Sequence, residues 1–539
     1  MQAAGINHVE LVILLLLLLV AVLAALAKRI GIPYPIILVI GGLCLSLVPY
    51  APRVTLNPNV VFLIILPPLI FFAAFHTSWR EFRRNLVSIF MLAFGLVGFT
   101  VFGVALATRW MLPDFDWPLG LVLGAVVATT DPISATATAR RLGIPRRLTD
   151  LLEAESLVND GSGLVALKFT AALVITGVTP TFTEGVGQLF YLITAGIAVG
   201  MITGVIFDWI ERNISEAPIE ITISIAIPYI AYLAAEAAGC SGVMATIACG
   251  LFLGRRSSGY YSLHARIESF AVWRTIDFAL NGVVFLVLGL QLPTILSEIR
   301  GFSMASLLAY AALFCAVVIL LRLVWVFPSV WLISRLRSRF RSGLAEPFSK
   351  RAAFIVGWSG MRGVLALAAA ISLPEKLNSG GAFPHRNLII FLTFCVIFTT
   401  LVLQGLSLPP LIRQLGLSGS TGTREEEETA RREMISAALA SLEHMRGENS
   451  PEQEEILDQI ELHYQRRWAL LEEEINQSSE SVNGTVTREH VRQYEAIERQ
   501  LRAVERSVAL KLRDENKIHD EVLRELEREL DLLDARYST

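Results

Sequence analysis

Residues 155 to 167 read ESLVNDGSGLVAL and lie inside an apolar stretch long enough to cross a membrane. Charges and unpaired amides are costly in lipid, so Glu155, Asn159 and Asp160 are expected to face the interior of a helix bundle. On a helix, Ser156 and Asp160 are four residues apart and share a face, as do Glu155 and Asn159. The motif therefore predicts one helix of a multi-span membrane protein whose centre is polar.

The rest of the chain agrees with this class. Of 539 residues, 53% are hydrophobic, and they occur in long blocks. A window of about 20 residues, the length of a membrane-crossing helix, predicts about thirteen spans and an all-α polytopic fold. The expected spans cover residues 11–27, 35–51, 59–76, 86–110, 117–139, 150–176, 186–210, 219–238, 240–254, 267–291, 303–333, 351–373 and 387–414.

Positive charge is divided unequally between alternate loops. If the N-terminus is outside, the outer loops hold few basic residues, namely Arg53, Arg109, Arg300, Lys376 and Arg386. Most of the other Lys and Arg residues before the tail fall in the opposite loops, which are therefore cytoplasmic by the positive-inside rule. Compact loops and no sign of organellar targeting favour a bacterial inner membrane.

The C-terminal part differs from the rest in charge. Residues 417–539 contain 17 Lys and Arg against 29 Asp and Glu, a net −12, which leaves +9 for residues 1–416. Leu, Ile and Val recur at helical spacing in this acidic segment, as in DEVLRELERELDLLDAR. We expect a transmembrane domain over 1–416 and a cytoplasmic helical tail over 417–539, with a dimerising or regulatory role.

Two predicted spans carry helix-breaking residues. The fifth contains ATTDPIS (128–134), where Pro132 disfavours helix at Asp131 and turns the Thr129 and Thr130 polar groups toward a ligand. The twelfth contains GWSGMRG (357–363), with glycines around Arg362. Two broken helices in corresponding positions indicate a transporter built from inverted repeats, although Pro and Gly also occur where helices only kink or pack closely.

Ser156 and Asp160 offer hard oxygen ligands suited to a small alkali cation. A buried carboxylate is stable when it is protonated, when it holds a cation or when it pairs with a basic side chain. The first two states exclude each other at one oxygen, which suffices to exchange a proton for a cation. For Glu155 the third state is favoured.

Basic side chains within the spans need anions. Arg322 and Arg362 keep their charge, so each needs an anionic partner, and Glu155 and Glu220 are the candidates. The role of Lys168, two turns beyond Asp160, stays open.

TTDP, ESLVNDG, EAPIEITISIAIPYIAYLAAE and GWSGMRGVLALAAA occur in this order and resemble the monovalent cation/proton antiporters of the NhaP and NHE group. The resemblance extends over roughly residues 10 to 415. It implies a homodimer of thirteen-span protomers, each with a dimerisation domain and a transport domain that moves like an elevator. It also implies electroneutral exchange of Na⁺, Li⁺ or K⁺ for H⁺, because relatives with Asn at the position of Asn159 are generally electroneutral, and a part in pH homeostasis.

The resemblance also assigns residues. It makes Asp160 the group that binds cation and proton in turn, Glu155 with Arg322 a structural ion pair, and Arg362 and Glu220 further intramembrane charged positions. The implied cation site consists of Thr130, Asp131, Ser156, Asn159 and Asp160, with Na⁺ held by Asp160, Ser156 and Thr130. One position departs from the pattern: Phe72 stands where many relatives carry an acidic residue, which leaves the ion preference open.

Other function classes fit less well. Gly357 to Gly360 resembles the GxSG of intramembrane serine proteases, but no histidine is predicted at midplane depth to activate Ser359. A cation channel would need a filter motif or a ring of charges. A K⁺/H⁺ antiporter remains the alternative. The five cysteines lie in apolar segments without a CxxC pair, so we expect them to form neither disulfides nor metal sites. We also expect no cofactor, apart from the transported ions, and no nucleic-acid partner.

Overall fold

The computed structural model divides the chain into two units, residues 1–420 and 421–539. In the first unit it describes residues 8–48, 58–112, 115–177, 181–214, 216–260, 263–299, 303–340, 349–378 and 380–417. In the second it describes only scattered residues between 432 and 468, so the predicted helices of the tail lie largely outside the described residues. The fold below is that of the first unit.

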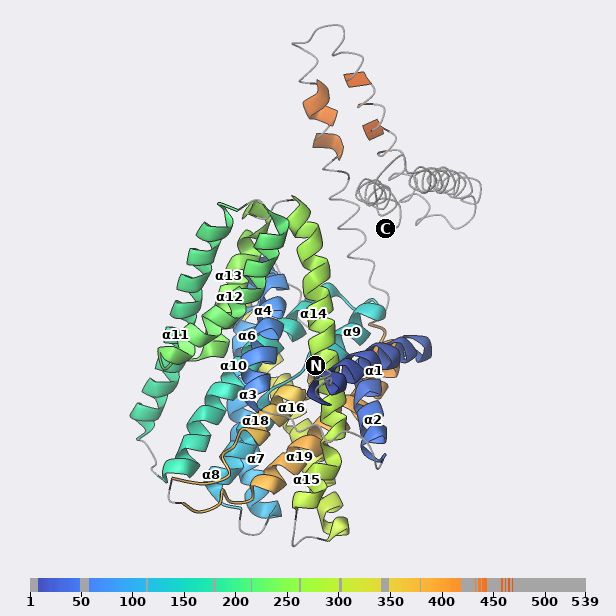
Figure 1. The fold of residues 1–539 in the computed structure, drawn as a ribbon. Coiled ribbons are helices and arrows are strands. Elements are labelled where there is room, and N and C mark those ends of the chain that lie inside the picture. Colours follow the sequence, from blue (N-terminus) through green and yellow to red (C-terminus); the bar gives the residue numbers. More distant parts are fainter. Residues whose placement is uncertain are drawn as a thin grey trace, which may run out of the picture. The chain divides into compact units, whose positions relative to one another are not determined.

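Regular structure in the described part is helical (Figure 1), with one isolated bridge between Lys376 and Ala382. The helices, with wide π-turns labelled η, are α1 His8–Ile30, α2 Tyr34–Ser46, α3 Pro58–Val60, η1 Val61–Ile65, α4 Leu66–His76, α5 Trp79–Arg84, α6 Leu86–Phe90, η2 Met91–Gly95, α7 Leu96–Met111, α8 Trp117–Ala128, α9 Ile133–Arg141, α10 Arg146–Thr176, α11 Phe182–Glu211, α12 Ala217–Ala237, α13 Gly242–Tyr260, α14 Leu263–Leu290, α15 Leu292–Glu298, α16 Met304–Phe340, α17 Lys350–Trp358, α18 Val364–Ile371, α19 Arg386–Thr399, η3 Thr400–Gln404 and α20 Gly405–Gln414. The predicted all-α membrane fold is confirmed.

Ten helical segments of the described chain are long and apolar enough to cross a membrane. Each coincides with a predicted span. The remaining predicted spans, 35–51, 240–254 and 351–373, fall on α2, on α13 and on the interrupted pair α17 and α18. The exact number of thirteen spans stays a prediction, because these segments are short, polar at one end or broken.

Both expected helix interruptions are present. Helix α8 ends at Ala128 and α9 begins at Ile133, after the short non-helical segment TTDP. Helix α17 ends at Trp358 and α18 begins at Val364. The two interruptions meet, because the backbone N–H of Asp131 donates to the carbonyl of Met361 at 2.8 Å. Each interruption thus supplies a partner for a backbone group that the other leaves free.

Three of the described spans contain π-turns, which release backbone carbonyls from the helical ladder. Side chains from other helices bind several of these carbonyls. Trp325 Nε1 donates to Met91 O at 3.1 Å, Ser162 Oγ to Ala93 O at 2.6 Å, and Tyr229 Oη to Ile64 O at 3.0 Å. The turn at η2 is therefore fixed to α10 and α16, on either side of it.

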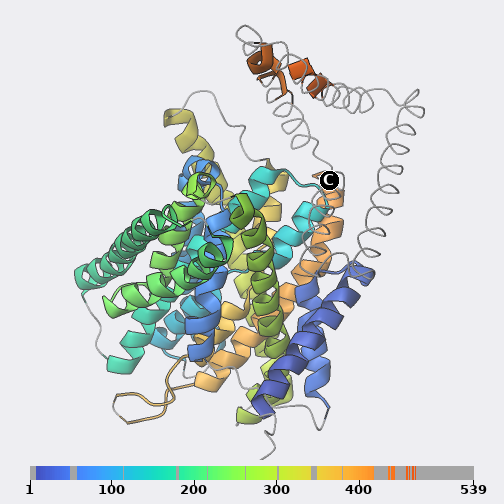
Figure 2. The same ribbon diagram turned by 45° about the horizontal axis from the view of Figure 1, so that its top comes forward.

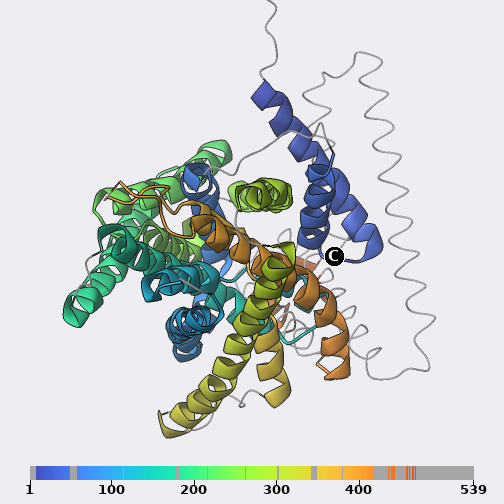
Figure 3. The ribbon, with the colours of Figure 1, turned by 90° about the horizontal axis from the view of Figure 1, so that it is seen from below.

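Helices α11, α12 and α13 form a group on one side of the unit, and α1 and α2 lie on the other (Figures 1 and 2). Figure 3 shows α14 end-on between α1 and α2 and the remaining helices. Helices α2 and α14 approach closely through glycines: a Cβ atom on Gly42 would lie 2.2 Å from Leu286 O. Helix α2 also contacts α9.

Candidate cation site

Helix α10 carries the ESLVNDG motif through the bundle without a break. Its polar residues are buried: Glu155, Ser156 and Asn159 are 1%, 2% and 0% exposed, and Asp160 is half-buried. Ser156 and Asn159 bind Thr130 in the interruption after α8, a helix that packs against α10, whereas Glu155 faces α16. The sequence motif therefore points into the protein, as its charge requires in a membrane.

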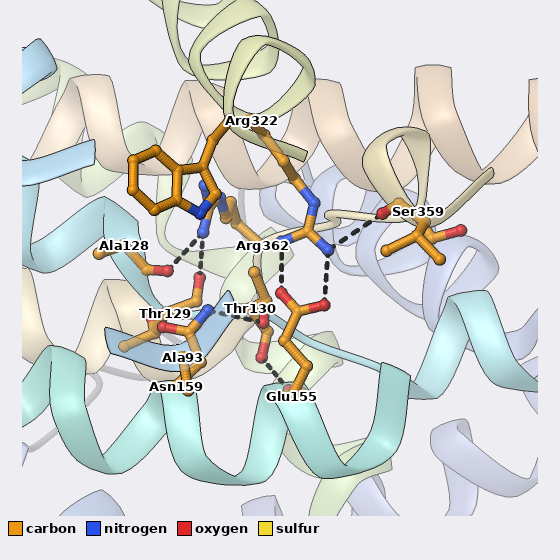
Figure 4. Close-up of polar contacts among 12 residues, drawn as sticks. Ala93, Ala128, Thr129, Thr130, Glu155, Asn159, Arg322, Ser359 and Arg362 are labelled. Atoms are coloured by element: carbon orange, nitrogen blue, oxygen red, sulfur yellow. Dashed lines mark hydrogen bonds and ion pairs between the residues drawn. The ribbon is translucent and has the colours of Figure 1, made fainter. Parts of the chain in front are cut away.

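The interruption after α8 and helix α10 are joined at Thr130 (Figure 4). Ser156 Oγ donates to the Thr130 carbonyl at 2.6 Å, and Asn159 Nδ2 donates to Thr130 Oγ1 at 3.2 Å. The backbone of Thr130 also faces the Asp160 carboxyl. The predicted residues of the fifth and sixth spans are thus brought together in one place.

Some of the side-chain oxygens around Thr130 accept no hydrogen bond. Within the described structure, Asp131 Oδ2, Asn159 Oδ1 and Asp160 Oδ1 are buried atoms without a hydrogen-bond partner. Leaving such an atom unsatisfied costs about 1–3 kcal/mol, more for a charged group. Asp131 and Asp160 are also close enough for their charges to interact. Unpartnered hard oxygens beside two carboxylates are the donor set that an alkali cation or a proton satisfies.

Asp131 has a second task. Its Oδ1 accepts the backbone N–H of Ile133 at 3.0 Å and so caps the first turn of α9. Capping of this kind satisfies one of the orphan N–H groups of a helix start. One carboxylate oxygen of Asp131 is therefore structural, while the other remains available.

The partner of Arg362 differs from the prediction. Its Nη1 donates to the carbonyls of Ala128 and Thr129, the latter at 3.0 Å, and its backbone N–H donates to Thr400 Oγ1 at 3.0 Å (Figure 4). These carbonyls are the negative end of half-helix α8. Arg362 was expected to need a carboxylate; instead it caps a helix end, within electrostatic reach of Glu155 and Asp160.

Glu155 and Arg322 form a two-bond ion pair. Arg322 Nη1 lies 2.7 Å from Glu155 Oε1, and Nη2 lies 3.0 Å from Oε2. Both side chains are almost fully buried, at 1% and 3% exposure, and Nη2 also donates to Val356 O at 3.1 Å. The pair joins α10, α16 and α17, so the structure places Glu155 against an arginine, one turn from Asn159.

The comparisons with known proteins agree with this geometry. The family model described as "Sodium/hydrogen exchanger, transmembrane" matches residues 14–414. The chain belongs to the sodium/hydrogen exchanger family. The chain is 31% identical to an uncharacterized Na⁺/H⁺ exchanger of Mycobacterium tuberculosis, over 94% of its own length and 92% of the relative.

Two further relatives carry more specific names. A sodium, potassium, lithium and rubidium/H⁺ antiporter of Bacillus pumilus is 31% identical over 78% of this chain and 64% of its own length. The Na⁺/H⁺ antiporter ApNhaP of Aphanothece halophytica is 31% identical over 76% of this chain and 75% of its own. The fold is also similar to that of the sodium proton antiporter MjNhaP1 from Methanocaldococcus jannaschii, with a TM-score of 0.60 at 19% identity, covering 75% of this chain and 97% of that one.

Several other polar residues of the chain lie away from Thr130. Glu220 is fully buried in the first turn of α12, a helix that packs mainly on α13 and α11. Lys168 pairs with Glu236 of α12, Nζ to Oε1 at 2.7 Å, in a partly exposed position. Lys168, whose role the sequence left open, therefore links α10 to α12. Ser359 Oγ donates to Ile355 O at 2.7 Å and so is bound to its own helix.

Phe72 belongs to a group of aromatic rings that pack on one another. Its ring lies parallel to that of Trp273 of α14, with centroids 6.1 Å apart and planes 15° apart. The position at which relatives were expected to carry a carboxylate is thus filled by an aromatic ring in the described structure.

One acidic residue near the site was missed in the sequence. Asp277 lies within α14, is half-buried, and is close enough to Asp131 for their charges to interact. The signal was present, because a carboxylate inside a predicted apolar span is a functional candidate by default. Its closeness to the TTDP segment could not be predicted, because the two are far apart in the sequence.

A testable consequence concerns Gly363. A Cβ atom there would lie 2.7 Å from Asp131 Cβ, and Asp131 is itself bound to Met361 where the two interruptions cross. Gly363→Ala is expected to lower stability by about 1–3 kcal/mol, because the crossing has no room to relax. The thermal unfolding midpoint of the purified protein measures this. Gly187→Ala, at a position with open space, is the control and should leave the midpoint unchanged or raise it.

Proposed function

We propose that this protein exchanges Na⁺ for H⁺ across the membrane, with both ions competing for Asp160. The observation that carries the proposal is the set of buried, unpartnered oxygens of Asp131, Asn159 and Asp160 around Thr130, at the meeting point of two interrupted helices. A soft-metal site is not supported, since the ligands are hard oxygens suited to alkali cations. The names of the antiporter relatives support the same ions.

The exchange follows from charge balance at one carboxylate. An ionised Asp160 attracts a cation, with Ser156, Thr130 and Asn159 supplying neutral oxygens beside it. When a proton binds, Asp160 becomes neutral, and the electrostatic attraction for the cation is lost. Both loaded states then have the same net charge, so carrying either one across the membrane moves no additional charge. One cation for one proton, and an electroneutral exchange, are the expected result.

Arg362 and the Glu155–Arg322 pair leave the net charge of the two loaded states to be set by Asp160. Glu155 is compensated by Arg322, so it does not take up a second cation. Arg362 offsets the negative end of α8 beside the site, which lowers the cost of an irregular backbone in the membrane. Asp160 is left as the carboxylate of α10 that changes its state during the cycle.

The same proposal includes the setting of the site. Residues 1–416 form the antiporter domain, which alternates access by an elevator-like motion in a homodimer, and needs no cofactor. The N-terminus is outside, and the acidic residues 417–539 form a cytoplasmic tail with a regulatory or dimerising role. The bacterial relatives support an inner-membrane location, where the exchange would serve pH homeostasis.

K⁺/H⁺ exchange is the second candidate. It is favoured by the Bacillus pumilus relative, whose name includes potassium, and by the aromatic ring at Phe72, which offers no carboxylate to a small ion. The site chemistry is common to both candidates, so the test below includes both ions.

The test uses purified protein in liposomes with a pH-sensitive dye inside. With an imposed pH gradient, adding Na⁺, Li⁺ or K⁺ is expected to dissipate the gradient, at a rate that is the same with and without a valinomycin-clamped membrane potential. Because proton and cation compete, the apparent KM is expected to rise by up to about tenfold for each unit by which pH falls, at constant maximal rate. No response to any of the three ions, or a rate that follows the potential, would contradict the proposal.

A further inference from the structure

Thr400, in the last predicted span, is connected to the cation site through a single peptide group. It is buried and begins the π-turn η3. Its Oγ1 accepts the backbone N–H of Arg362 at 3.0 Å, within the interruption between α17 and α18. The proposed exchange cycle gives Thr400 no task, although π-turns inside helices often lie at functional sites.

The peptide group that Thr400 binds also holds Asp131. The N–H of Arg362 and the carbonyl of Met361 belong to the same peptide bond, and in a planar trans peptide they point in opposite directions. The carbonyl of Met361 accepts the backbone N–H of Asp131 at 2.8 Å. This buried peptide is therefore held by Thr400 on one side and by Asp131 on the other.

The hydroxyl of Thr400 is oriented to accept this bond. Thr400 Oγ1 donates its own proton to Val396 O at 2.8 Å, one turn earlier in α19, so its lone pairs remain for the N–H of Arg362. Without that oxygen the buried N–H would have no acceptor. A peptide that turns to find another acceptor takes its carbonyl away from Asp131.

Both ends of the TTDP segment are bound to Met361 and Arg362. The side chain of Arg362 donates to two carbonyls at the end of α8 (Figure 4), and the carbonyl of Met361 holds the backbone of Asp131. Thr130 lies between these two attachments, and its carbonyl and hydroxyl bind side chains of α10. The position of the Met361–Arg362 peptide therefore sets where the polar groups of the fifth span lie relative to α10.

Thr393 shows that the hydrogen bond within α19 does not distinguish Thr400. Thr393 is fully buried on the same helix, and its Oγ1 donates to Ile389 O at 2.7 Å, again one turn earlier. Within the described part of the chain, its hydroxyl makes no hydrogen bond to another helix. The bond to a second segment is thus what sets Thr400 apart from this otherwise similar residue.

We propose that Thr400 is a positioning residue for the cation site, which sets the apparent affinity for the cation by holding the Met361–Arg362 peptide against Asp131. Thr400 acts through this peptide and not as a ligand of the ion. Asp160, which carries the exchange, lies on the unbroken helix α10 and does not depend on the peptide for its place. The inference rests on the proposed exchange.

The test compares Thr400→Val with wild type in the liposome assay. Valine has nearly the shape of threonine but lacks the hydroxyl, so the acceptor is removed. The apparent KM for Na⁺ is expected to rise about tenfold, while the maximal rate per folded protein stays within about threefold. Thr393→Val makes the same change on the same helix and is the matched control, whose KM should stay within about twofold of wild type. Size-exclusion chromatography measures the amount of folded protein.

Two further variants separate positioning from a structural role. Thr400→Ser keeps the hydroxyl and loses only a methyl group, so its KM is expected to stay within about twofold of wild type. Thr400→Cys places a weaker acceptor of similar size at the same position, and its KM is expected to lie between those of wild type and Thr400→Val. A role in packing alone would lower the amount of folded protein and leave the KM unchanged.

Failure of this inference differs from failure of the proposed exchange. If wild type shows no cation-dependent proton movement, the exchange itself is wrong. If wild type exchanges ions but Thr400→Val has the KM of wild type, the positioning role is refuted, and the same holds if Thr400→Ser raises the KM as much as Thr400→Val. If Thr400→Val does not fold, Thr400→Cys decides: a raised KM supports the role, and an unchanged KM refutes it.

Discussion

Asp160→Asn is expected to reduce Na⁺-dependent proton movement by about a hundredfold or more, to the background of empty liposomes. An amide neither ionises nor takes up a proton in this range, so the variant loses both the attraction for the cation and the proton that is exchanged. The shape of the side chain is kept, and a buried charge is removed, so the folded structure should be retained or stabilised. The liposome assay with Na⁺, Li⁺ and K⁺ measures the effect.

Asp116→Asn is the matched control for this prediction. Asp116 is exposed at the start of α8, and its side chain makes no capping hydrogen bond there. The same chemical change at that position should leave the exchange rate within about twofold of wild type, because surface substitutions rarely matter. A normal Na⁺ response in Asp160→Asn would show that another group carries the proton, and the assignment of Asp160 would have to be given up.

Arg322→Ala is expected to lose most of the folded protein. The substitution leaves Glu155 buried at 1% exposure without its two charged hydrogen bonds, and breaking such a pair costs about 3–5 kcal/mol. This cost is comparable to the total stability of many domains, so the yield of monodisperse protein should fall steeply. Fluorescence-detected size exclusion and the thermal unfolding midpoint measure it.

The Lys168–Glu236 pair gives a control on the same helix. It also joins α10 to a neighbouring helix, but its side chains are 49% and 34% exposed. Lys168→Ala is therefore expected to cost at most about 1 kcal/mol, because water screens an exposed pair. The double variant Glu155→Leu with Arg322→Met removes both buried charges and should recover much of the lost yield. Full yield of Arg322→Ala together with a changed KM for Na⁺ would show a role in ion binding instead of folding.

Much of the site could be predicted from particular residues. Pro132 after Asp131 and the glycines around Arg362 indicated where two spans would break, since proline and glycine act through their own backbone. The four-residue spacing of Ser156 and Asp160 on one helix required only helical geometry. Glu155 was assigned an arginine because a buried carboxylate needs a countercharge. These inferences hold whatever the neighbours are.

Other features depended on which helices meet. Arg362 donates to the carbonyls of Ala128 and Thr129, which lie more than two hundred residues earlier in the chain. The sequence around Arg362 does not predict this partner. The sequence suggested a carboxylate, since backbone carbonyls are free only where a helix is interrupted and another segment crosses it. The hydrogen bond between Asp131 and Met361, which defines that crossing, likewise joins two distant segments.

The sequence alone determined the membrane class of the chain, its interrupted helices and the candidate polar residues of its sixth span, because apolar length, proline, glycine and buried charge act locally. Only the tertiary structure decided which charges meet. It paired Arg322 with Glu155, gave Arg362 to the end of α8, and brought Asp277 toward Asp131. The physical reason is that electrostatic partners are selected by distance in space, and the packing of α2, α10 and α14 sets those distances.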